Sequence, residues 1–224
     1  MNPAASPTLM KDQYGDDWWM CLHKRFLIES TEQEPDVLFI GDFTVSMIAH
    51  TDMWEKLFIG MHCLNFGIAE DQTQHVLWRI ENGEIDTLNP KIVVLGVGTN
   101  NHDNTVEQIL EGIHACVKAI TARHPSATVV VVKLFPSGQN PNPVRKKIEE
   151  VNKQLEGILH GISQVQVVNL DPGFVQIDGT ISHHDMYDYR HLTRHAARRA
   201  YEPLADLLQQ LICERSGTES ASYD

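Results

Sequence analysis

The amino-acid sequence predicts a three-layer α/β fold, in which helices cover both faces of a parallel sheet. Five short apolar runs alternate with segments of helical periodicity, which is typical of βαβ units with right-handed crossovers. Three of the runs contain several β-branched residues and little polar alternation, as strands covered on both faces do. The runs are 37–41, 63–68, 92–97, 128–134 and 165–170. We therefore expect a single flavodoxin-like domain.

Three of the segments between or after these runs carry clear helix signals. One begins at Asn104, with a glutamate three positions later as in a capping box, and closes at Pro125. The next opens at Pro143 and ends before Gly161, in line with the preference for proline at a helix start and glycine after its end. The last predicted helix covers about residues 193–213.

The chain divides into three parts by composition. Residues 1–15 are polar and contain proline, and residues 214–224 are small and polar, so we expect a flexible arm and a flexible tail. Residues 16–213 form the single domain. No run of about 18 apolar residues occurs, so no membrane span is expected. The first residues lack the apolar run of a signal peptide.

The composition is that of an acidic globular protein. The 224 residues include 18 Lys+Arg and 30 Asp+Glu, which gives a formal net charge of −12. This charge repels a polyanion and no basic stripe offsets it, so nucleic-acid binding is not expected. The cysteines show neither a CxxC pair nor zinc-type spacing. We interpret them as reduced, mostly buried thiols of a cytoplasmic protein. They are Cys21, Cys63, Cys116 and Cys213.

Chemistry is expected at one edge of the predicted sheet. In open parallel sheets, binding sites lie beyond the carboxyl ends of the strands. The informative positions are therefore those that directly follow the first four apolar runs. They are residues 41–43, 67–71, 98–101 and 135–137, and a His- and Asp-containing segment, 182–193, lies nearer the C-terminus.

Six separated stretches together resemble one known family. They are EPDVLFIGD (34–42), LNFGIAED (64–71), HVLWRIENGE (75–84), VGTNNHDNT (97–105), PNPVR (141–145) and HDMYDYRHLT (184–193). They resemble the GDSL/SGNH esterases, and more closely the α catalytic subunits of intracellular (brain, isoform Ib) platelet-activating-factor acetylhydrolases. The resemblance covers about residues 16–213. It implies an SGNH hydrolase-type fold, a homodimer and, as partner, the WD-repeat lissencephaly protein. It implies no cofactor.

The resemblance also implies which residues would carry the chemistry. In this family the residue after Gly-Asp is a nucleophilic serine, and an Asp-x-x-His near the C-terminus supplies the orienting carboxylate and the base. Backbone N–H groups and an asparagine hold the oxyanion. Carried over to this chain, Asp188 and His191 match the orienter and the base, and Asn100 matches the asparagine. Phe43 stands at the serine position and Glu70 at the position of an oxyanion glycine.

These two departures bear directly on activity. Phe43 has no nucleophilic atom, and loss of a triad nucleophile alone costs on the order of 10⁶ in kcat. A side chain at position 70 also stands where the backbone is expected to need special dihedral angles. A carboxylate about 4 Å from an oxyanion would be repelled by roughly 4 kcal/mol at an effective dielectric of 20. Both changes oppose acyl transfer.

The sequence therefore predicts a catalytically inactive homologue, retained for dimerisation or partner binding. One alternative is an active acetyl esterase or phospholipid acetylhydrolase that uses Thr44 or Ser46 with His191 and Asp188, although both hydroxyls suit helix caps. Another is a lipid- or ester-binding module in the old acyl pocket, which Phe43 would partly fill. A water activated directly by His191 is a further alternative.

The histidine-rich segment has a second interpretation as a metal site. Some of its spacings would place ligands on one helical face. The resemblance offers no metal, however, and Tyr and Arg interrupt the set, so we predict no metal site there. In an inactive chain, Asp188 and His191 are instead expected to form an inherited structural contact. The candidate ligands are His183, His184, Asp188, His191 and His195.

Overall fold

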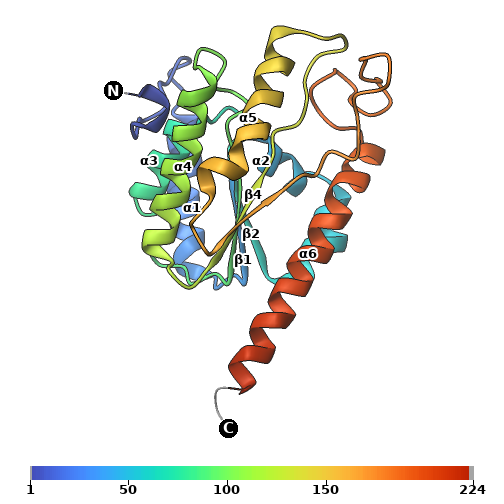
Figure 1. Ribbon diagram of the computed structural model, residues 1–224. Coiled ribbons are helices and arrows are strands. Elements are labelled where there is room, and N and C mark those ends of the chain that lie inside the picture. The colour runs from blue at the N-terminus through green and yellow to red at the C-terminus, as the bar shows by residue number, and fades with distance from the viewer. Residues whose placement is uncertain (1, 222–224) are drawn as a thin grey trace.

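A computed structural model describes residues 2–221 and shows a five-stranded, entirely parallel sheet with the strand order β2-β1-β3-β4-β5 (Figure 1). The predicted three-layer α/β fold is thus confirmed. The strands are β1 (Val37–Gly41), β2 (Cys63–Gly67), β3 (Ile92–Gly96), β4 (Thr128–Val132) and β5 (Val165–Val168). The longer helices are α1 (Trp18–Glu32), α2 (Phe43–Ala49), α3 (Thr73–Glu81), α4 (Val106–Arg123), α5 (Pro143–Leu159) and α6 (Arg194–Ala221).

The sheet separates two hydrophobic cores. Leu38 and Ile40 of β1 point into the core that α1, α3, α4 and α5 cover, whereas Val37 and Phe39 point into the core beneath α2 and α6. Figure 1 shows α1, α3 and α4 on one side of the sheet and α6 on the other. All five residues of β1 are buried, because helices cover both faces of this strand.

The helix boundaries differ in part from the sequence prediction. The N-cap of α4 is Thr105, whose side chain accepts a hydrogen bond from the backbone N–H of Gln108, and Gln108 completes the capping box. Asn104 therefore precedes the cap. The last helix begins one residue later than expected and continues past residue 213 to Ala221, so the predicted tail is helical over 214–221. The rest of the predicted tail, 222–224, lies outside the described residues.

The first residues pack against the domain, contrary to the expected loose arm. Residues Pro3–Ala5 form a 3-10 turn, η1, and Ala4 is fully buried. The backbone carbonyl of Ala4 accepts a 2.7 Å hydrogen bond from the hydroxyl of Thr73 at the start of α3. Gly112 of α4 makes this approach feasible, because a Cβ atom there would lie 2.6 Å from the Ala4 carbonyl oxygen. The start of the chain is thus seated between α3 and α4.

The four cysteines differ in their burial. All four cysteines are free thiols, but only Cys116 is buried, Cys63 is half-buried, and Cys21 and Cys213 are exposed. The expectation of mostly buried thiols is therefore wrong for two of the four. Within residues 2–221, no helix has both the length and the apolar character that crossing a bilayer requires.

Candidate functional site

The loop between β1 and α2 lies at the carboxyl edge of the sheet, and Asp42 organises it. One carboxylate oxygen of Asp42 caps α2 by accepting the backbone N–H of Thr44 at 2.9 Å. The other oxygen accepts the backbone N–H groups of Gly98 and Thr99, at 3.2 and 3.3 Å, from the loop after β3. Burial raises the pKa of Asp42 to about 6, against the effect of these hydrogen bonds. Asp42 is therefore a structural carboxylate that joins two site loops.

A glycine before Asp42 allows the two strand ends to meet. A Cβ atom at Gly41 would lie 2.0 Å from the carbonyl oxygen of Gly96, well inside van der Waals contact. The same carbonyl accepts the backbone N–H of Asp42 at 2.8 Å. Packing between β1 and β3 thus requires a glycine at position 41, independently of any chemistry at residue 43.

Phe43 is the first residue of α2, and its ring faces His191. The side chain is half-buried, and the two ring centroids lie 5.1 Å apart with an interplanar angle of 74°. This edge-to-face arrangement is the favoured geometry for aromatic pairs. The structure thus brings together residues 43 and 191, which are far apart in the sequence.

Asp188 and His191 form a hydrogen-bonded pair, as the family resemblance implied. His191 Nδ1 lies 2.6 Å from Asp188 Oδ2, and the other carboxylate oxygen accepts the backbone N–H groups of His191 and Arg190 at 2.7 and 3.0 Å. Burial acts to raise the pKa of Asp188, but the hydrogen bonds from His191 and Arg190 outweigh it, so the pKa is lowered. The carboxylate is ionised at neutral pH and fixes the imidazole orientation.

The backbone around this pair forms a tight loop. Met186 and Leu192 make an isolated antiparallel bridge, and the Tyr187 N–H donates to the His191 carbonyl at 3.1 Å. Tyr189 adopts a positive φ of 64° at the turn. The ring of Tyr187 stacks on the imidazole with a centroid distance of 5.9 Å. The imidazole therefore has aromatic neighbours in both Phe43 and Tyr187.

Asn100 follows β3, but its amide group is already engaged. Its Nδ2 donates to the carbonyl oxygen of Ala69 at 2.9 Å and to that of Asp71 at 2.8 Å. A primary amide has two N–H donors, so both are used. Asn100 therefore ties the loop after β3 to the loop after β2.

Glu70 lies in that second loop and is exposed. The backbone N–H of Asp71 donates to the carbonyl of Ile68 at 3.1 Å and closes the turn around it. Among the described residues other than glycine, positive φ values occur only at Asp17, His62 and Tyr189. The expectation that position 70 needs special dihedral angles is thus wrong, because this turn accepts an ordinary residue.

The two candidate replacement nucleophiles point toward the sheet. Thr44 is only 3 % exposed. A Cβ atom added to Gly96 of β3 would lie 3.5 Å from the Thr44 Cβ, so this side chain packs against the sheet. Ser46 is also buried, and a Cβ on Gly67 of β2 would lie 2.9 Å from the Ser46 Cβ. The ring of His191 contacts Phe43 and Tyr187 instead.

The histidine-rich segment does not converge on one point. His183 and His184 are ring neighbours with a centroid distance of 4.1 Å, whereas His191 pairs with Asp188. In the part of the chain that the structure describes, no three His, Cys, Asp or Glu side chains are grouped as metal ligands would be.

Sequence reasoning missed a buried ion network beneath these loops. Arg79 of α3 is fully buried and donates to Asp71 at 2.8 Å and to Glu84 at 2.6 Å. It also donates to the carbonyl of Gly41 at 3.2 Å, directly before the Asp42 turn, and to that of Phe66 at 2.9 Å. Trp19 and His23 of α1 complete the network, at 2.7 Å from Asp71 and Glu84 respectively.

Burial affects the protonation of the network and of its neighbour His75. It raises the pKa of Asp71 to about 6, although Arg79 and Trp19 act in the opposite direction. It lowers the pKa of His75 to about 4, and the charge of Arg79 adds to this effect. The Nδ1 atom of His75 accepts the backbone N–H of Gln72 at 3.1 Å, which requires this nitrogen to be unprotonated.

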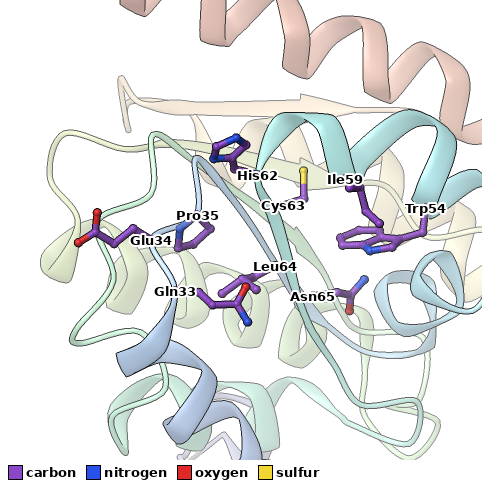
Figure 2. A pocket seen from close by; sticks show the side chains of 9 residues that line it. All are labelled: Gln33, Glu34, Pro35, Trp54, Ile59, His62, Cys63, Leu64 and Asn65. Atoms are coloured by element: carbon purple, nitrogen blue, oxygen red, sulfur yellow. The ribbon is translucent and has the colours of Figure 1, made fainter.

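A cavity of about 650 Å³ lies beside the edge strand β2, away from this site (Figure 2). Its walls include Pro35 before β1 and Cys63 at the start of β2, so it opens at the amino ends of the strands. Burial and the nearby Asp36 carboxylate raise the pKa of the Cys63 thiol to about 12. This cavity therefore holds no thiolate nucleophile.

Comparisons with known proteins identify the class. The sequence model of the GDSL-like Lipase/Acylhydrolase family matches residues 51–199, and the chain belongs to this family. Within it, the chain is a homologue of the platelet-activating factor acetylhydrolase IB subunits. It is 49 % identical over 216 residues to subunit alpha1 from Homo sapiens, covering 96 % of this chain and 94 % of the relative. It is 48 % identical over 214 residues to the subunit beta homolog from Drosophila melanogaster, covering 96 % and 95 %.

Solved structures support the fold. A GDSL-like lipase from Bacteroides thetaiotaomicron matches with a TM-score of 0.69 and 18 % identity, covering 86 % of this chain and 98 % of the other. A carbohydrate acetylesterase from Sinorhizobium meliloti, Est24, matches with a TM-score of 0.56 and 18 % identity, covering 80 % and 100 %. At this identity the likeness concerns the fold alone, which is the SGNH hydrolase-type fold that the resemblance implied.

Proposed function

We propose that this chain is a catalytically inactive homologue of the platelet-activating factor acetylhydrolase IB subunits, retained for dimerisation or partner binding. The observation that carries the proposal is the ring of Phe43, which stands at the first residue of α2 and packs 5.1 Å from the imidazole of His191. By resemblance, this is the position of the family's nucleophilic serine. A phenyl ring offers no attacking atom, and losing the nucleophile costs on the order of 10⁶ in kcat.

The pair of Asp188 and His191 is vestigial in this proposal. Its 2.6 Å contact is the geometry in which an orienting carboxylate holds a general base. The neighbour of the imidazole at position 43 is therefore a hydrocarbon ring instead of a hydroxyl. The pair then orders the loop before α6, which is the structural contact that the sequence analysis described.

The oxyanion positions support the same conclusion. Both amide hydrogens of Asn100 are donated to the carbonyl oxygens of Ala69 and Asp71, so this arrangement leaves none for a tetrahedral oxyanion. Glu70 adds a carboxylate at the position of the family's glycine. In the proposed assignment Phe43 and Glu70 are lost catalytic positions, and Asn100 is a vestigial oxyanion residue.

Binding is the function left to such a chain. The buried network around Arg79 and the Asp42 turn preserve the loops of the site without serving chemistry. By resemblance, the proposed associations are a homodimer and a complex with the WD-repeat lissencephaly protein. Native mass spectrometry would report the dimer, and a pull-down with the purified WD-repeat protein would report the complex. A monomer that fails to capture this protein would refute the binding half of the proposal.

A second candidate is an active acetyl esterase or phospholipid acetylhydrolase with Thr44 or Ser46 as nucleophile. The observation that favours it is the intact geometry of Asp188 and His191. The burial of Thr44 and the packing of Ser46 against Gly67 argue against it. Because nucleophile and base must be within hydrogen-bond reach, an active chain would need α2 to rearrange.

Labelling with a fluorophosphonate probe and hydrolysis of p-nitrophenyl acetate separate the two candidates. We expect the native chain to show neither, and the double variant Phe43→Ser with Glu70→Gly to gain stoichiometric labelling that His191→Ala abolishes. Phe43→Ala with Glu70→Gly is the matched control, since it removes the ring without adding a hydroxyl. Labelling of the native chain that Thr44→Ala or Ser46→Ala removes would establish the second candidate and overturn the first.

A further inference from the structure

A cavity of about 630 Å³ lies between η2 (Trp54–Phe58) and the first turns of α6, outside the site described above. Three cationic side chains line it: Lys56 from η2, and Arg194 and Arg198 from α6. All three are largely exposed, at 64 %, 77 % and 67 % of the side-chain surface. The cavity thus presents ammonium and guanidinium groups to solvent from two distant parts of the chain.

The positive charge is unusual for this molecule, whose net charge is −12. Residues 190–199 hold four arginines and two histidines without one acidic residue. Folding then brings Lys56 into the same cavity. The expectation of no basic stripe overlooked this segment, and Lys56 joins Arg194 and Arg198 only in three dimensions. The start of α6 adds the partial positive charge of a helix N-terminus.

The two carboxylates in the cavity, Asp52 and Glu202, engage only some of the N–H donors of the three cationic side chains. A single oxygen of Asp52 lies 2.7 Å from the Lys56 ammonium and 2.5 Å from the Arg194 guanidinium. Glu202 lies 2.6 Å from Arg198 Nε. A guanidinium has five N–H donors and an ammonium three, so most of the donors stay free. Three cations face two carboxylates, and Asp52 already shows that an anionic oxygen is accommodated between two of them.

The cavity also has an apolar part. Met53 is buried and Leu57 packs against the core beneath α6, and both line the cavity beside the cations. A purely inorganic ion would leave these side chains unused. The combination therefore suits an anionic group attached to a carbon skeleton.

We propose that this cavity binds a phosphate-type oxyanion carried on a small organic molecule. Lys56, Arg194 and Arg198 hold the phosphoryl oxygens, because forked guanidinium donors match several acceptor oxygens at once. Met53 and Leu57 contact the organic part. Asp52 acts as the internal competitor that an incoming anion must displace from Lys56 and Arg194. This binding does not depend on whether the chain hydrolyses esters.

Titration of the full-length protein with inorganic phosphate and with butyl phosphate, at constant ionic strength, tests the proposal. Chemical-shift changes of the backbone and arginine side-chain N–H resonances would locate and quantify binding. We expect Arg194→Ala and Lys56→Ala each to weaken binding about tenfold or more, since each removes charged hydrogen bonds. Asp52→Asn is expected to strengthen it severalfold. Butyl phosphate should bind more tightly than inorganic phosphate.

The matched control is Arg25→Ala, which removes an exposed, ion-paired arginine from α1 on the opposite face of the sheet. It should leave both affinities unchanged. Equal weakening by Arg25→Ala would show non-specific attraction to the surface and overturn the proposal. Shifts that avoid η2 and α6, or no shifts beyond those in sodium chloride, would also overturn it. Equal affinity for the two probes would refute the organic carrier and leave only an inorganic anion.

Discussion

At the residue scale, Arg79 is the most consequential side chain that the sequence did not reveal. It is a buried cation whose guanidinium reaches two carboxylates and two backbone carbonyls at the carboxyl edge of the sheet. In the sequence it reads as an ordinary polar residue of the stretch HVLWRIENGE. Val76 and Ile80 mark the buried face of α3, and Arg79 lies on the same face. This helical position was the signal from which the burial of Arg79 could have been predicted.

We expect Arg79→Met to lower the free energy of unfolding by about 3–5 kcal/mol, because Asp71 and Glu84 are then buried without a counter-charge. Urea unfolding at pH 7 would measure it. Arg123→Met is the matched control, since Arg123 pairs with Asp86 near the surface and such pairs contribute about 0–1 kcal/mol. Similar losses in the two variants would show that burial of the network has no special weight.

His75 predicts a pH dependence of stability. Its pKa is lowered to about 4 in the folded chain, whereas an unfolded histidine has a pKa of about 6.5. As the pH falls from about 6.5 to 4, the unfolded chain takes up a proton that the folded chain does not, so stability decreases.

His75→Asn keeps an acceptor for the Gln72 N–H and removes this titration. Between pH 6.5 and 4, the free energy of unfolding should decrease by about 1–3 kcal/mol less in the variant than in the native chain. Unfolding curves at a series of pH values would show it. His160→Asn, at an exposed histidine, is the control for the substitution itself. A variant at position 75 with the native profile would contradict the assignment.

At the element scale, the sequence predicted the sheet better than the helices. The five strands were found because runs such as 92–96 and 128–132 are apolar and β-branched, which is a local signal of double-sided burial. The helix α1 begins at Trp18, and its N-cap residue Asp17 makes no side-chain cap hydrogen bond, so α1 lacks a strong local start signal. The helix α2 is capped by Asp42 but has only seven residues, which is too short for a clear helical periodicity. The same limit applied to the site. The resemblance implied the pairing of Asp188 and His191, but the hydrogen bonds of Asn100 to two carbonyl oxygens arise only in the tertiary structure.

The contact between α2 and β2 depends on Gly67. A Cβ there would lie 2.4 Å from the backbone nitrogen of Ser46, so Gly67→Ala must push α2 away from the sheet. We expect a loss of about 1–3 kcal/mol, as for other overpacked sites.

Gly157→Ala is the control, because Gly157 lies inside α5 with nothing within 4 Å of an added Cβ. It should instead stabilise the chain by about 0.5–1 kcal/mol. Thermal unfolding should show a lower Tm for Gly67→Ala and a higher Tm for Gly157→Ala. A change in Tm of the same sign in both variants would contradict this packing description.

At the scale of the whole molecule, the N-terminal residues belong to the folded unit. The buried Ala4 and the hydrogen bonds from Thr73 to Ala4 and from Asn2 to Gln108 join the start of the chain to α3 and α4. Composition alone suggested a loose arm, because small and polar residues give no apolar pattern. The fit of the turn against Gly112 is a property of the assembled domain.

Deleting residues 1–8 should therefore destabilise the domain by about 1–3 kcal/mol, from lost hydrogen bonds and the exposure of Thr73 and its surroundings. For a chain of this size this corresponds to a decrease in Tm of about 2–4 °C per kcal/mol. Replacing the exposed residues 11–15 by a Gly/Ser sequence of equal length is the control and should change Tm little. An unchanged Tm after the deletion would restore the view of a loose arm.

The carboxylate of Asp42 separates architecture from reactivity in this fold. It fastens the loops that follow β1 and β3 to each other through backbone N–H groups. The neighbouring position is consequently open to replacement: an aromatic ring can stand there and the framework still closes around it. In the inactive homologue that we propose, this framework therefore persists without a nucleophile, and the surface that it shapes stays available for recognition by other proteins.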